Sequence, residues 1–170
     1  MNLDDALTVA LSTTPAAGAY RDALITIGEH LGRVVEPPLG AVGVSIGASG
    51  RTLLEGVTAA WGSVPTFSAM QHLGHGADRG LTFEWVNGEP PVDLPWVVCD
   101  VHVYTGVTVR ALLDSLATRA SVPAVMVLAV RAKARGRRHI LDHYPSVSIV
   151  DPTTIVRRPL AERVNGKGHG

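Results

Sequence analysis

The fold is decided by residues 96–113, which read WVVCDVHVYTGVTVRALL. The stretch opens with a continuous apolar run, as a parallel strand buried on both faces requires, and this run ends at Asp100. A turn-rich segment follows, and residues 107–119 then carry apolar side chains at helical spacing. The stretch therefore predicts a buried strand that ends at an acid, a tight loop, and a helix whose N-terminus lies within residues 105–108.

The same alternation of strand and helix continues on both sides of this unit. Residues 16–35 predict an amphipathic helix, residues 41–46 form another buried run, and residues 51–61 return to helical spacing after a glycine-rich turn. Further strands are expected at residues 64–70, 81–86, 124–130 and 147–150. This order predicts one α/β domain over residues 1–170, with an open, mostly parallel sheet flanked by helices and a small flap or hairpin at residues 81–86.

Composition excludes several classes of protein. The chain has 170 residues, enough for one core, and its 15 basic residues balance 15 acidic ones, which removes the bulk electrostatic argument for a nucleic-acid or anionic-membrane partner. The first residues carry acids where a signal peptide carries bases, and no apolar run approaches the ~20 residues of a membrane span. The single Cys99 excludes a disulfide framework. We expect a cytoplasmic protein without a membrane partner.

The loop after the Asp100 strand has the composition of an anion site. Backbone amides at a helix start point outward, the helix dipole adds positive charge, and Gly106 would let a phosphate approach the chain. The hydroxyls of Thr105 and Thr108 can donate as well. Ligands of open α/β sheets bind beyond the carboxyl ends of the strands, so Asp100 would face the same cleft and hold ribose hydroxyls or balance positive charge on a sugar ring. The alternative is an ordinary turn with a threonine cap.

The order of strand, acid, short loop and Thr-Gly-x-Thr at a helix start resembles the signature with which type I phosphoribosyltransferases bind 5-phosphoribosyl 1-diphosphate (PRPP). Residues 103–116, VYTGVTVRALLDSL, are especially similar to the pyrimidine-operon attenuation regulators. Other stretches resemble the uracil phosphoribosyltransferases: residues 8–32 their N-terminal helix, residues 41–56 their first strand and pyrophosphate loop, and residues 139–154 their last strand. The likeness runs over nearly the whole chain in the family's order.

The resemblance implies an enzyme of pyrimidine salvage that transfers ribose 5-phosphate from PRPP to a uracil-like or other small heterocyclic base and releases pyrophosphate. It also implies Mg²⁺ bound mainly through PRPP and pyrophosphate, and a homo-oligomer. The catalytic candidates are Asp100 and Arg79, the latter on the flap, and His102 is a possible substrate contact or proton shuttle. The residues that align with the family's phosphate loop are Val103, Tyr104, Thr105, Gly106, Val107 and Thr108. Those that align with its pyrophosphate loop are Ala48, Ser49, Gly50 and Arg51.

Departures from the family pattern favour a second hypothesis. Ala48 stands where the uracil enzymes carry an arginine, and Val101 and Val107 stand where family loops usually carry other residue types. The sequence also stops at Gly170, where the base-recognition loop of those enzymes would be developing. These features are expected of a non-catalytic regulator that senses PRPP or a nucleotide, RNA-linked through the basic residues 131–138. A run of charges is more often a solvated edge, and overall neutrality makes a nucleic-acid partner the less favoured interpretation.

Two further patterns in the sequence give little indication of function. His72 and His75 have ligand-like spacing, but zinc requires three or four ligands and no cysteine or carboxylate accompanies the pair at a recognisable spacing. We therefore predict no metal site made by protein side chains. Cys99 falls inside the predicted strand and is expected to be a small buried apolar residue rather than a nucleophile.

Overall fold

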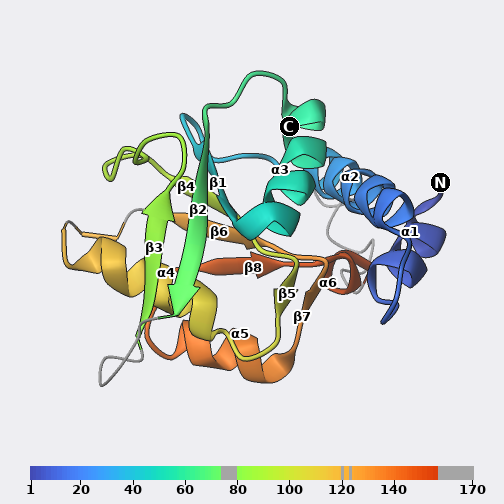
Figure 1. The fold of residues 1–170 in the computed structure, drawn as a ribbon. Coiled ribbons are helices and arrows are strands. Elements are labelled where there is room, and N and C mark those ends of the chain that lie inside the picture. The colour runs from blue at the N-terminus through green and yellow to red at the C-terminus, as the bar shows by residue number, and fades with distance from the viewer. Residues whose placement is uncertain (74–79, 120, 123, 157–170) are drawn as a thin grey trace, which may run out of the picture.

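The expected strands form one sheet. In the computed structural model, which describes residues 1–73, 80–119, 121–122 and 124–156, six strands follow the order β3-β2-β1-β4-β6-β8 (Figure 1). Neighbouring strands run parallel except for the antiparallel pair of β2 and β3. The strands are β1 (Val42–Ile46), β2 (Thr66–Leu73), β3 (Leu81–Trp85), β4 (Trp96–Cys99), β6 (Val125–Leu128) and β8 (Ser148–Val150). The predicted mostly parallel sheet with a hairpin is confirmed.

Helices cover both faces of the sheet. Figure 1 shows α1, α2 and α3 on one side and α4 and α5 on the other, and the two clusters of buried side chains divide in the same way. The helices are α1 (Leu3–Ala10), α2 (Ala17–Val34), α3 (Gly47–Trp61), α4 (Val107–Ala117), α5 (Ala134–Leu141) and α6 (Pro152–Val156). None of the helices in the described part of the chain is long and apolar enough to cross a membrane.

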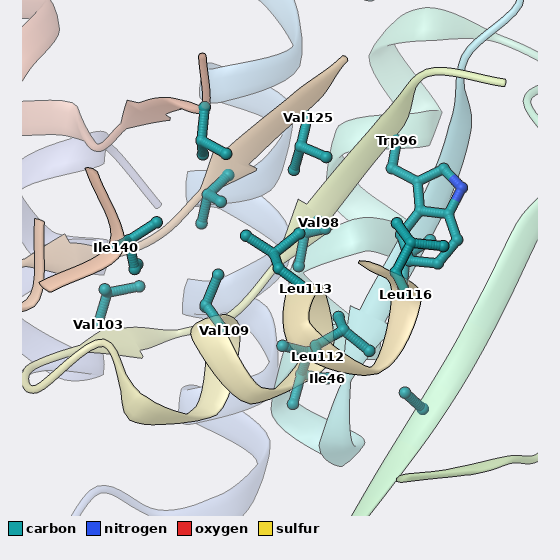
Figure 2. Close-up of a cluster of buried hydrophobic side chains, with 14 of the residues drawn as sticks. Ile46, Trp96, Val98, Val103, Val109, Leu112, Leu113, Leu116, Val125 and Ile140 are labelled. Atoms are coloured by element: carbon teal, nitrogen blue, oxygen red, sulfur yellow. The ribbon is translucent and has the colours of Figure 1, made fainter. Parts of the chain in front are cut away.

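Strand β4 is buried on both faces, which explains its unbroken run of apolar residues. Trp96 and Val98 point to the face covered by α4 and α5, where they pack in the cluster of Figure 2, whereas Val97 and Cys99 belong to the cluster beneath α2 and α3. All four side chains are buried. Both faces of this strand are therefore core, which confirms the interpretation of Cys99 as a buried apolar residue.

A small second sheet lies beyond the carboxyl end of the first. It pairs β5 (His102–Val103) in parallel with β7 (Arg131–Ala132). The sequence predicted a loop at residues 102 and 103, because a two-residue strand has no periodic signal. The N–H of Lys133 also donates to Val103 O at 3.0 Å, so this side sheet carries the chain directly into α5.

The expected glycine-rich turn after β1 is wrong, because α3 begins at Gly47 itself. Gly47 has φ 67°, a left-handed conformation that turns the chain within one residue and that residues with a Cβ rarely adopt. Gly50 lets the first helical turn approach β4, since a Cβ there would lie 2.5 Å from the Cys99 carbonyl oxygen. Residues 48–51 are therefore helical, and α3 starts directly against the end of β4.

Helices α2 and α3 are joined by direct contact between their backbones. A Cβ on Gly28 of α2 would lie 2.3 Å from Leu53 O, and a Cβ on Gly56 of α3 would lie 2.3 Å from Ile25 O. No side chain fits between these surfaces. The seam therefore holds α2 close to α3 and sets the position of the residues that α2 presents at the end of the sheet.

Candidate active site

A pocket of about 360 Å³ lies at the carboxyl ends of β1 and β4. It is lined by Tyr20, Ile46, Gly47, Ala48, Ser49, Gln71, Asp100, Val101, His102 and Thr108. The two stretches expected to bind PRPP, one after β1 and one after β4, thus meet at a single pocket. From the predicted residues, the structure brings Ala48, Ser49, Asp100, His102 and Thr108 together there.

Two helices start at this pocket. Ala48 and Ser49 belong to the first turn of α3, and Thr108 belongs to the first turn of α4. First-turn N–H groups have no partner within their own helix, and the helix dipole adds partial positive charge at the same end. Gly106 is the N-cap residue of α4, and the N-cap residues of α3 and α4 make no side-chain cap hydrogen bond. Thr105 Oγ1 lies 3.5 Å from the Val107 N, a long and weak contact. Both helix ends can therefore receive an anion.

Gly106 has a packing role that the sequence did not predict. Its φ is 76°, and a Cβ on it would lie 2.5 Å from Gly136 O in α5. In return, a Cβ on Gly136 would lie 2.4 Å from Val103 O. The absence of a side chain at Gly106 thus lets residues 104–106 rest on α5.

Asp100 directly follows β4, and its N–H donates to Leu128 O at 3.2 Å. Burial raises the pKa of its carboxyl group to about 6, while hydrogen bonds from the backbone N–H groups of His102 and Val101 act in the opposite direction. A carboxyl group of this kind is largely ionised at pH 7. Asp100 therefore places a negative charge between the two helix N-termini.

His102 is half-buried and lines the same pocket. Its ring stacks on Tyr104 with a centroid separation of 5.0 Å, and Lys133 Nζ lies 4.5 Å from the centroid of the Tyr104 ring. Burial, with a smaller contribution from Arg131, lowers the pKa of His102, and its Nε2 is buried without a partner among the described residues. The imidazole is therefore neutral at pH 7, held in place by its aromatic neighbour.

Several predicted residues lie elsewhere. Arg51 is exposed on α3 and lines a different pocket with Glu55 and Asn87, because a helical residue two positions after Ser49 points about 200° away from it. Tyr104 and Val107 are 41% and 47% exposed and do not fill the pocket. Val103 is buried in β5.

The flap arginine, Arg79, lies outside the described residues, and so do His75 and residues 157–170. His72 pairs across the hairpin instead, with Nε2 3.1 Å from Glu84 Oε2. Over the ranges that the structure describes, no group of three or more His, Cys, Asp or Glu side chains could hold a metal ion.

Besides Ile46, Gly47 and Val101 next to the strand ends, two more distant residues of the lining were not predicted as site residues. Tyr20 comes from α2, where its spacing indicated only the apolar face of a helix, and Gln71 comes from β2, beyond the predicted end of that strand at Met70. Neither belongs to a motif. Strand alternation continued past Met70 is the one signal that could have included Gln71 in the sheet.

No family model matches the sequence, and no curated protein does either. Solved structures do match. The AQ2163 protein from Aquifex aeolicus has a TM-score of 0.70 at 16% identity, over 86% of this chain and 80% of that one. Adenine phosphoribosyltransferase from Trypanosoma brucei, in complex with AMP, pyrophosphate and ribose-5-phosphate, has a TM-score of 0.61 at 13% identity, over 98% and 84%. The fold is that of the type I phosphoribosyltransferases.

A third similar structure belongs to another branch of that fold. Orotate phosphoribosyltransferase from Aeropyrum pernix has a TM-score of 0.50 at 16% identity, over 83% of this chain and 76% of that one. The predicted fold is therefore confirmed, whereas these adenine and orotate enzymes give no support to a closer relation with the uracil enzymes or the attenuation regulators. At such identities the likeness concerns the fold alone.

Proposed function

We propose that this protein binds PRPP and transfers its ribose 5-phosphate to a nitrogen of a uracil-like or other small heterocyclic base, with release of pyrophosphate. The observation that carries the proposal is the pocket in which the N-termini of α3 and α4 meet beside Asp100. The fold shared with phosphoribosyltransferases supports it.

Each end of PRPP has a matching part of the pocket. The 5-phosphate binds at the N-terminus of α4, with the Thr105 and Thr108 hydroxyls as further donors, and pyrophosphate binds at the amides of Ala48 and Ser49 in α3. The ribose then lies over Asp100 between them. Two anionic groups at two helix ends are each stabilised by the partial positive charge of the helix.

Mg²⁺ is expected to enter with the substrate. Asp100 is the single carboxylate among the lining residues, and one or two carboxylates together with substrate phosphates are a usual ligand set for this ion. When bound, the ion offsets the charge of the pyrophosphate group. Among the residues that the structure describes, the lining includes no lysine or arginine that could serve this purpose.

The residues of the chain position the reactants and stabilise charge. As the bond between the anomeric carbon and pyrophosphate breaks, positive charge develops on the ribose beside the Asp100 carboxylate, and the base nitrogen bonds to the same carbon. Neutral His102 lines the pocket, and because its Nε2 is buried, its Nδ1 is the atom that would accept a hydrogen bond or the proton that the base loses. The Tyr20 ring and the Gln71 amide supply a stacking surface and a paired donor and acceptor for the base.

Calorimetry with PRPP and Mg²⁺, followed by a screen of free bases for pyrophosphate release, tests this function. Asp100→Asn should retain PRPP binding and lose turnover by about 100-fold or more. Glu29→Gln, which removes the remote Glu29–Arg33 ion pair on α2, is the matched control and should change neither. Unchanged turnover in Asp100→Asn would show that the carboxylate has another role.

A non-catalytic PRPP-sensing regulator is the second candidate. The described residues of the pocket lining include no lysine or arginine, and Ala48 stands at the position of the family arginine, which favours this candidate. Binding of PRPP without turnover on any base would select this candidate, and absence of PRPP binding would refute both. The homo-oligomer remains a prediction, which light scattering coupled to size-exclusion chromatography tests.

A further inference from the structure

Asp151 is a buried carboxylate that lies outside the pocket. It follows β8, is 1% exposed, and uses both of its carboxylate oxygens. Oδ2 accepts from Ala132 N at 2.8 Å and from Arg137 Nη2 at 2.9 Å, and Oδ1 accepts from Thr153 Oγ1 at 2.6 Å and from Thr154 N at 3.1 Å. Burial opposes its ionisation, but these bonds outweigh burial and hold the pKa of Asp151 below its usual value.

Arg137 extends this contact into a cross-link between three elements. Besides binding Asp151, its Nη1 donates to Ile149 O in β8 at 2.6 Å and its Nε donates to Ala132 O in β7 at 3.3 Å. The side chain itself belongs to α5. The pair of Asp151 and Arg137, here called the latch, therefore ties β7 and α5 to the edge strand of the main sheet.

The elements held by the latch carry the loop at the N-terminus of α4. β7 pairs with β5, where Val103 lies opposite Ala132. Gly136 of α5 packs against Val103 O and Gly106, which are on either side of residues 104 and 105. A path of direct contacts thus runs from Asp151 through β7 and α5 to the loop that precedes α4, without passing through the pocket.

We propose that Asp151 is a positioning residue for the 5-phosphate end of the pocket, acting through Arg137 and the β5–β7–α5 unit to hold the loop before α4. The identity of the phosphate ligand rests on the function proposed above. The pyrophosphate end lies at α3, which packs on β4 and α2 instead. The latch therefore affects one end of the substrate and not the other.

Separate titrations of ribose 5-phosphate and of pyrophosphate by calorimetry test this asymmetry. Asp151→Asn should weaken ribose 5-phosphate binding about tenfold, the order expected when one charge-assisted hydrogen bond is lost, and should leave pyrophosphate binding within about twofold. Arg137→Gln should give the same pattern, and Glu29→Gln should change neither affinity. Equal weakening of both ligands, or of neither, overturns the proposal, because a loss of general stability has no reason to select one end.

Amide hydrogen exchange tests the latch independently of any ligand. In Asp151→Asn the Lys133 amide, which donates to Val103 O, should exchange faster, while that of Val98 in the central strand should not change. If the Lys133 amide exchanges as slowly in the variant as in the native protein, the latch is overturned even if PRPP binds. If it exchanges faster but no ligand binds, only the proposed function is refuted. Should Asp151→Asn fail to fold, Thr153→Val removes a single bond to the same carboxylate and should give the same two readouts at smaller size.

Discussion

Substitution of Gly106 by alanine measures how tightly the loop before α4 rests on α5. The new Cβ meets two obstacles: a φ of 76°, which disfavours any residue with a side chain, and the Gly136 carbonyl oxygen at 2.5 Å. The left-handed conformation costs about 1–2 kcal/mol. The forced contact adds about 1–3 kcal/mol, as overpacking of a filled interior does, because the obstructing atom is backbone and cannot rotate away.

Gly40→Ala is the matched control for this substitution. Gly40 has φ 73°, and a Cβ there would meet nothing within 4 Å. The change in the unfolded chain is the same for both variants, so it cancels in their comparison. Gly106→Ala should therefore lose about 1–3 kcal/mol more unfolding free energy than Gly40→Ala.

Urea unfolding followed by circular dichroism provides both values, and thermal unfolding should show a difference of about 2–4 °C in Tm for each kcal/mol. Ribose 5-phosphate binding should weaken in Gly106→Ala alone. Equal losses of stability in the two variants would refute the reasoning, since the contact with α5 would then contribute nothing beyond the backbone conformation.

Three further predictions concern the end of β4. Because burial raises the pKa of Asp100 to about 6 from 3.8, the folded protein binds more protons than the unfolded chain between these values. The free energy of unfolding should therefore fall as pH rises through this window in the native protein but not in Asp100→Asn. Urea unfolding at a series of pH values measures this. If the variant shows a fall of equal size, the pH dependence belongs to another group. Gly50→Ala should cost about 1–3 kcal/mol through its contact with Cys99 O, whereas Gly18→Ala, with open space around its Cβ, should stabilise α2 by up to about 1 kcal/mol. Burial raises the pKa of the Cys99 thiol, so a thiol reagent should label it only as the protein unfolds in urea, and rapid native-state labelling would contradict its burial.

The strands and main helices were predictable because burial on both faces of a parallel strand leaves an unbroken apolar run. The elements that were missed lack such a signal. Helix α5 buries Gly136 and Ile140 within an arginine-rich sequence, so its pattern indicated a solvated charge run rather than a helix. The turn at Gly47 depends on one backbone dihedral angle, which the sequence could not distinguish from a longer glycine-rich loop.

The candidate site was predictable where it follows from topology and not where it follows from packing. Asp100 and Thr108 were identified because the carboxyl ends of parallel strands meet at one edge of the sheet. Tyr20 and Gln71 reach the pocket through the placement of α2 and of the β2–β3 hairpin, which no local pattern encodes. Arg51 was misplaced because an expected loop is a helix, in which Arg51 points about 200° away from Ser49 of the pocket lining.

The backbone contacts that join α2 to α3, and α3 to the end of β4, have a consequence for ligand selection. Main-chain atoms meet there at Gly28, Gly56 and Gly50, so α2 and α3 are held by backbone contacts and resist displacement when a ligand enters the pocket beside them. Gln71 lines the pocket from β2 and is an exposed side chain. Under the proposed function, we therefore expect acceptors of different size to be accommodated at the hairpin, so substitutions that change the choice of base are best sought in β2 rather than in the helices.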